Sequence, residues 1–68
     1  MKIEVNGRTV DVHEGISVAE LVEEAGAEPQ ARGVAVAVEG EVVPRSAWKQ
    51  TKVAPGQTVE VLEAIQGG

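Results

Sequence analysis

Apolar and polar residues alternate along the N-terminal segment of the chain. Ile3 and Val5 alternate with polar residues, and a second alternating segment runs from Thr9 to His13. This period of two is typical of half-buried strands. Asn6-Gly7 lies between the two segments and favours a type I′ turn, because both residues tolerate a positive φ. The pattern predicts a β-hairpin.

A helical pattern follows the hairpin, from Ser17 to Ala25. The Ser17 hydroxyl can cap the helix, and Glu20 three residues later completes a capping box. Gly26 follows where a left-handed C-cap belongs. The apolar positions recur at the spacing of one helix face, and they are Val18, Leu21, Val22 and Ala25.

The C-terminal half contains three apolar segments. The segment 34–38 reads Val-Ala-Val-Ala-Val and is apolar on both faces. It indicates a strand covered on both sides or, alternatively, a surface of small alanines that a partner covers. Segment 41–43 predicts a short strand. The last strand is expected at 58–65, with Val59 and Val61 pointing inward.

The expected order of elements is β-β-α-β-β-β, which favours the α+β class. It predicts a mixed sheet of about five strands with one main helix packed across one face, as in ubiquitin-like (β-grasp) folds. In such folds the last strand commonly lies beside the first. We expect one β-grasp domain over residues 1–65 and a flexible diglycine tail over residues 66–68.

Composition and charge exclude several classes of function. The chain has 68 residues, no cysteine, one histidine and a formal net charge of -5, so it is one domain without cysteine-based metal or redox sites. The acidic balance argues against a basic nucleic-acid-binding face. No apolar run approaches the roughly 20 residues that span a bilayer. We expect a cytoplasmic protein that binds neither metal nor membrane.

The chain ends in Gln66-Gly67-Gly68, which is either an unimportant end or a reactive one. Glycine has no Cβ, so a diglycine tail can thread a narrow channel and leave the terminal carboxylate unhindered. Transfer of AMP from ATP to the Gly68 carboxylate would activate it toward a sulfur nucleophile or an amine. The glycines of this chain do not form a phosphate-binding spacing, so a partner enzyme must supply ATP and magnesium.

Blocks of sequence over the whole chain match a known pattern. They are Val5-Asn6-Gly7, Val34-Ala35-Val36-Ala37-Val38, Val42-Val43-Pro44-Arg45-Ser46-Ala47-Trp48, Pro55-Gly56, Val59-Glu60-Val61 and Ala64-Ile65-Gln66-Gly67-Gly68. Together they resemble the ThiS-type sulfur carriers of thiamine biosynthesis. Glu39 departs from that pattern, where asparagine is frequent in an Asn-Gly turn, and Gln57-Thr58 replaces a common Asp-Xaa pair.

The resemblance implies a β-grasp fold and a carrier that is not itself an enzyme. It implies that a ThiF-like adenylyltransferase activates Gly68, and that sulfur comes from a cysteine desulfurase system. The resulting thiocarboxylate would supply a ThiG-like thiazole synthase. None of these steps requires a cofactor bound by this chain.

Four residues are candidates for contact with a partner. Leu62 and Ala64 have the opposite parity from the inward valines of the last strand, so they are expected to form an outward docking surface unless both faces are covered. Trp48 is either a core residue or an interface anchor, and the core hypothesis is favoured. Arg45 pairs with an acidic group on a partner, or it is a solvated charge or forms a local salt bridge, and it could serve both roles.

Other functions remain open from the sequence. A protein modifier would be joined through Gly68 to lysines of other proteins. A sulfur carrier could also supply molybdopterin or tRNA thiolation. A plain binding module that works through its sheet surface would not require the two terminal glycines at all.

Overall fold

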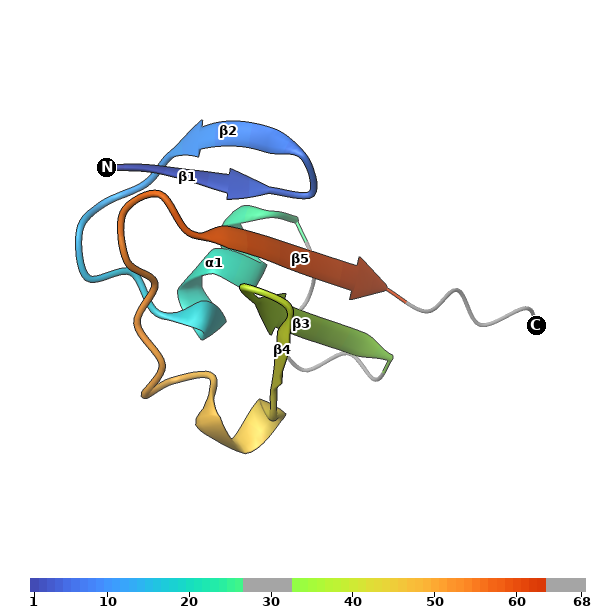
Figure 1. Cartoon of the computed structure of the whole chain (residues 1–68). Coiled ribbons are helices and arrows are strands. Elements are labelled where there is room, and N and C mark those ends of the chain that lie inside the picture. Colours follow the sequence, from blue (N-terminus) through green and yellow to red (C-terminus); the bar gives the residue numbers. More distant parts are fainter. Residues whose placement is uncertain (27–32, 64–68) are drawn as a thin grey trace.

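The alternating N-terminal segment forms the expected hairpin in the computed structural model, which describes residues 1–26 and 33–63. Strand β1 (Lys2–Val5) pairs antiparallel with β2 (Arg8–Asp11) (Figure 1). Asn6 and Gly7 connect them with φ values of 51° and 82°. Both residues therefore adopt the left-handed conformation that a type I′ turn requires.

Helix α1 (Val18–Glu24) follows, with Ser17 as its N-cap. The Glu20 backbone N–H donates to the Ser17 hydroxyl at 3.1 Å, and the Glu20 carboxylate accepts the Ser17 N–H at 2.9 Å. The predicted capping box is thus confirmed. Gly26 has a φ of 89°, which agrees with its expected place after the helix.

Three further strands complete a mixed sheet. They are β3 (Val34–Val38), β4 (Glu41–Val43) and β5 (Thr58–Glu63), and a 3₁₀ turn (Arg45–Ala47) follows β4. The sheet order is β2-β1-β5-β3-β4, with β5 parallel to β1 and antiparallel to β3. The predicted β-grasp arrangement is confirmed, including the last strand beside the first. The expected strand residues Ala64 and Ile65 lie outside the described residues.

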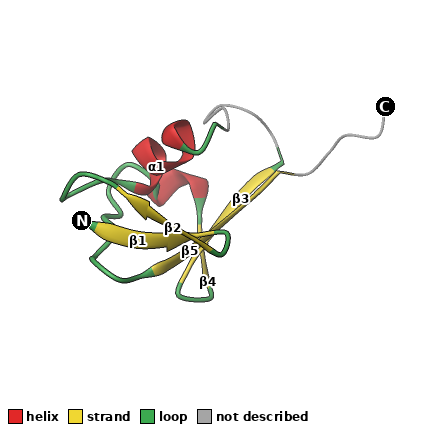
Figure 2. Cartoon of the chain, turned by 90° about the horizontal axis from the view of Figure 1, so that it is seen from above, coloured by secondary structure: helices red, strands yellow, loops and turns green. Residues whose placement is uncertain are grey.

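The core lies between the sheet and α1, which crosses one face of the sheet (Figure 2). Its buried apolar residues come from β1, α1, β3 and β5, and from the loops that precede α1 and β5. They are Ile3, Val5, Val12, Ile16, Val18, Leu21, Val22, Val36, Trp48, Val53, Val59 and Val61. The inward positions predicted on the last strand are therefore correct.

Coverage of β3 differs from one of the two expectations. Val36 is 1% exposed, whereas Ala35 is exposed. The prediction that both faces of β3 are covered was wrong, because α1 packs on one face of the sheet and no described element packs on the other. No helix in the described ranges is long and apolar enough to cross a membrane.

Candidate functional site

The central strand of the sheet leads toward the C-terminal tail. β5 lies between β1 and β3 and ends at Glu63. Five residues follow Glu63 in the sequence, and the candidate residues Ala64, Gln66, Gly67 and Gly68 are among them. They lie outside the described residues, so the structure defines the strand and the surface that precede the tail.

An apolar surface covers the face of the sheet opposite α1. Leu62 is 63% exposed and Val42 is 74% exposed. The register pairs Leu62 with Ala35, and it pairs Ala37 with Val42. Because residues directly opposite in an antiparallel pair share a face, these side chains are neighbours. We call this set, Ala35, Ala37, Val42 and Leu62, the outer apolar patch.

The outward position of Leu62 agrees with the parity prediction, and the patch around it is larger than parity on one strand could indicate. The sequence also indicates the alanines of β3 as a possible partner surface. Val42 was missed, because its neighbours become known only from the pairing of β3 with β4. The signal that could have found Val42 is the alternation in segments 34–38 and 41–43. If the two segments form a hairpin, their outward residues lie on one face.

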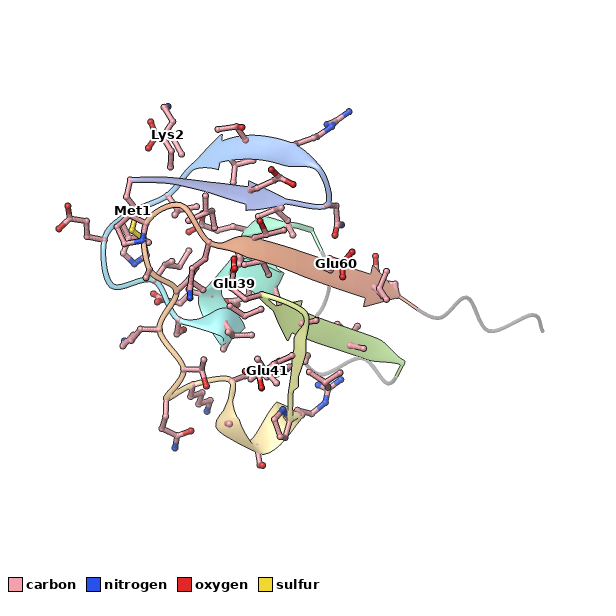
Figure 3. The ribbon with its side chains drawn as sticks, in the orientation of Figure 1. Met1, Lys2, Glu39, Glu41 and Glu60 are labelled. Carbon is pink, nitrogen blue, oxygen red and sulfur yellow. The ribbon has the colours of Figure 1, made fainter. Side chains whose placement is uncertain are left out.

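Carboxylates accompany the outer apolar patch. Glu60 pairs in register with Ala37 and shares its face, and Glu4 lies on the same face beside Thr58. Glu60 and Glu4 have no ion pair with any described residue. Figure 3 shows Glu60 on β5, away from Lys2 at the start of β1. The patch is therefore apolar with a negative border.

Arg45 and Trp48 form a pair of their own. Trp48 is 3% exposed, and its Nε1 donates to the carbonyl oxygen of Val43 at 2.9 Å. The Arg45 guanidinium lies 4.6 Å from the centroid of the Trp48 ring, a cation–π distance. The burial confirms the core hypothesis for Trp48. Of the two residues, Arg45 is the one that a partner could contact, because its side chain is exposed.

No group of three or more histidine, cysteine, aspartate or glutamate side chains that could hold a metal occurs in residues 1–26 and 33–63. An open hollow of about 210 Å³ lies between the hairpin and α1, lined by Val10, Leu21 and Glu24 among others. It is on the α1 side of the sheet, whereas the outer apolar patch is on the other face.

Two carboxyl groups have lowered pKa values for structural reasons. The Lys2 ammonium and then the N-terminal ammonium hydrogen-bond to Asp11 and lower the pKa of its carboxyl. The Ser17 backbone N–H lowers the pKa of Glu20. Neither carboxyl lies in the outer apolar patch, so these shifts concern stability.

Stability should therefore fall in acid. A carboxyl whose pKa is lower in the folded state stabilises the fold above its unfolded pKa, and this contribution is lost as the pH falls through the folded value. The loss should begin near 4.5 for Glu20 and near 3.8 for Asp11 and continue below these values. Urea midpoints measured by circular dichroism against pH should show it.

The matched variants for this test are Glu20→Gln and Asp11→Asn. In each variant the urea midpoint should fall less steeply as the pH is lowered, because an amide does not titrate. If the urea midpoint of both variants falls in acid as steeply as that of the wild type, other groups cause the loss of stability.

Known proteins resemble the chain over its whole length. The model of the ThiS family matches residues 2–68. A crystal structure of a thiamine biosynthesis protein (ThiS) from Geobacter metallireducens is similar with a TM-score of 0.81 and 37% identity, covering 100% of both chains. A solution structure of a thiamine biosynthesis protein from Geobacter metallireducens is similar with a TM-score of 0.80 and 40% identity, covering 100% of this chain and 88% of the other.

No curated protein matches the chain. The family match nevertheless includes the outer apolar patch, β5 and the terminal diglycine, and the structural matches agree with the observed sheet and helix. The chain therefore belongs to the ThiS family.

Proposed function

We propose that the chain is a cytoplasmic sulfur carrier of thiamine biosynthesis whose working group is the carboxylate of Gly68. The observation that carries the proposal is the family match over residues 2–68, which includes Gly67 and Gly68. In this proposal residues 1–65 form the folded carrier, and residues 66–68 form the tail that enters the partner enzyme.

A carboxylate does not react with nucleophiles at neutral pH, so the Gly68 carboxylate must first be activated. An oxygen of the Gly68 carboxylate attacks the α-phosphorus of ATP, and pyrophosphate leaves. A persulfide of the donor then attacks the carbonyl carbon of the acyl-adenylate and AMP leaves. A second thiol of the donor system cleaves the resulting acyl disulfide, which yields the thiocarboxylate and leaves a disulfide on the donor. A ThiF-like adenylyltransferase supplies the nucleotide site and magnesium, a cysteine desulfurase system supplies the sulfur, and a ThiG-like thiazole synthase consumes it. The chain itself is a cosubstrate.

The outer apolar patch is the surface we assign to docking of the activating enzyme. An exposed apolar patch on a small protein commonly marks an interaction site. Leu62 belongs to the patch and also to the strand that leads into the tail. The Gly68 carboxylate would therefore be within reach of a partner that docks on the patch. The carboxylates of Glu60 and Glu4, which have no ion pair with a described residue, favour a partner surface with basic residues around an apolar centre.

The test is the intact mass of the purified chain after incubation with ATP, magnesium, a ThiF-like enzyme and a sulfur donor. We expect replacement of one carboxylate oxygen by sulfur. Oxidation of Met1 or Trp48 changes the mass almost equally, so fragmentation must place the change at Gly68. A chain that lacks Gly68 is the control and should remain unmodified. If the wild-type tail is neither adenylated nor thiolated, the proposal is wrong and a binding module takes its place.

The destination is tested separately, with the thiocarboxylate form. We expect a ThiG-like thiazole synthase to consume it, and cells without the gene to require thiamine. Growth without thiamine, together with a molybdenum-enzyme or tRNA-thiolation defect, would redirect the carrier to those products. Protein conjugates that disappear when Gly68 is deleted would indicate a modifier.

A further inference from the structure

The turn between β1 and β2 lies beside the C-terminal half of β5 (Figure 1). The parallel register of β1 with β5 is short and covers only Glu4 with Thr58 and Val5 with Val59. The backbone N–H of Asn6 still donates to the carbonyl oxygen of Val59 at 3.0 Å. At Asn6 the chain turns toward β2, so the backbone of β1 stops flanking β5 at this point.

The side-chain amide of Asn6 continues the pairing where the backbone of β1 stops. Its Oδ1 accepts the backbone N–H of Val61 at 2.8 Å, and its Nδ2 donates to the carbonyl oxygen of Val61 at 3.1 Å. In a longer β1, a backbone carbonyl and a backbone N–H from two neighbouring peptide groups would occupy these positions. The amide therefore takes the place of a strand residue that β1 does not have.

This contact is close to the end of β5. Only Leu62 and Glu63 follow Val61 in the strand, and the register pairs them with Ala35 and Val34 of β3. Without the Asn6 amide, the last three residues of β5 would be paired on the β3 side alone. The end of the strand would then be free to twist or lift from the β1 side.

We propose that Asn6 is a positioning residue that fixes the direction in which the tail leaves β5 relative to the outer apolar patch. The proposal rests on the proposed function of Gly68. Five residues separate Glu63 from the end of the chain and span at most about 18 Å, so the position of the strand end limits the points that the carboxylate can reach from a docked carrier. A displacement of about 1 Å at reacting atoms can cost roughly 100-fold in rate.

Two variants separate the amide from the turn. Asn6→Gly removes both side-chain hydrogen bonds and keeps the turn, because glycine accepts the φ of 51° that Asn6 adopts. Asn6→Asp also keeps the turn, but a carboxylate has no donor for the carbonyl oxygen of Val61. A protonated carboxyl offers one donor and one acceptor, as the amide does. The Asp variant should therefore keep the bond from the Val61 N–H and regain the bond to the Val61 carbonyl in acid, whereas the Gly variant has neither bond.

The first readout is hydrogen exchange at the Val61 amide, measured by NMR and compared with the wild type at each pH. In Asn6→Gly it should be faster by about five- to tenfold, the effect of one lost hydrogen bond. In Asn6→Asp it should stay closer to the wild-type rate at every pH, because a carboxylate oxygen still accepts the Val61 N–H. Exchange in Asn6→Gly as slow as in the wild type, or exchange as fast in Asn6→Asp as in Asn6→Gly, overturns the positioning role.

The second readout is the kinetics of adenylation by a ThiF-like enzyme, with the concentration of the carrier varied. In Asn6→Gly the kcat should fall about tenfold or more, whereas the KM for the carrier should change less than twofold, because misplaced reacting atoms slow the step without weakening docking.

The matched control for the kinetics is Glu39→Gly. Glu39 begins the β3–β4 turn with a φ of 52°, and its carboxylate accepts the Thr58 N–H at 2.6 Å. It thus makes a similar bond to the opposite end of β5, and its variant should keep the wild-type kcat.

The outcomes separate the inference from the function on which it rests. If the wild type is adenylated and Asn6→Gly has the same kcat, the inference is wrong and the proposed function stands. An equal loss of kcat in Asn6→Gly and Glu39→Gly would also overturn it, because general loosening of β5 would explain both. If the wild type is never adenylated, the proposed function fails.

Discussion

Replacing Leu62 by aspartate should lower the rate of tail activation by roughly 30-fold or more, as loss of an interface hot spot of about 2 kcal/mol would do. Leu62 is 63% exposed, so its side chain contributes little to the core. A charge at this position would have to be desolvated against an apolar partner surface. The expected result is therefore weak docking with a folded carrier.

The measurement is adenylation kinetics at several carrier concentrations, with a circular dichroism spectrum and urea midpoint for each variant. Leu62→Ile is the apolar control and should keep most of the activity. Thr9→Asp places the same charge on the same face of the sheet, on β2 beside Glu4, and should also be activated normally. If Leu62→Asp is activated at the wild-type rate, the outer apolar patch is not the docking surface.

Replacing Trp48 by alanine should have the largest effect on stability. Removing a buried tryptophan typically costs about 3–5 kcal/mol, and a domain of this size has a total stability of roughly 3–10 kcal/mol. The ring is 3% exposed. The loop that carries it is also tied to α1, because the N–H groups of Val18 and Ala19 donate to the carbonyl oxygens of Thr51 and Trp48.

Urea unfolding followed by circular dichroism measures this effect, because the variant has lost the only fluorescent tryptophan. Trp48→Phe keeps an aromatic ring but removes the donor to Val43, so we expect a smaller loss of about 1–3 kcal/mol. The Phe variant should still be activated at close to the wild-type rate. A wild-type urea midpoint for Trp48→Ala would contradict its place in the core, and a lost activation of a stable Trp48→Phe would favour the interface hypothesis.

The local elements followed from the sequence because their causes are local. Asn6-Gly7 accepts positive φ, and Ser17 with Glu20 closes a capping box within one helical turn. The parity of Val59 and Val61 identifies the buried face of β5, because side chains alternate with a period of two. The chemistry expected of Gly68 is also local, since it follows from an unhindered carboxylate, and it stays a prediction because the tail lies outside the described residues.

Which strands lie side by side was decided by the tertiary structure. β5 pairs with β1 and β3 through contacts between residues far apart in the sequence, and no local pattern encodes such a partner. The apolar face of 34–38 could belong to a covered strand or to a partner surface, and only the position of α1 on the other side of the sheet decided for exposure.

The same reason limits what the sequence says about the site. It indicated Gly68 and the outward Leu62, but Val42 joins Leu62 only through β3, and Trp48 could have been core or interface until its burial was known. Asn6 was recognised as a turn residue, yet its amide reaches Val61, 55 positions away. The sequence by itself thus determined the elements and the reactive end, whereas the fold decided which side chains meet, because hydrogen bonds and burial depend on proximity in space.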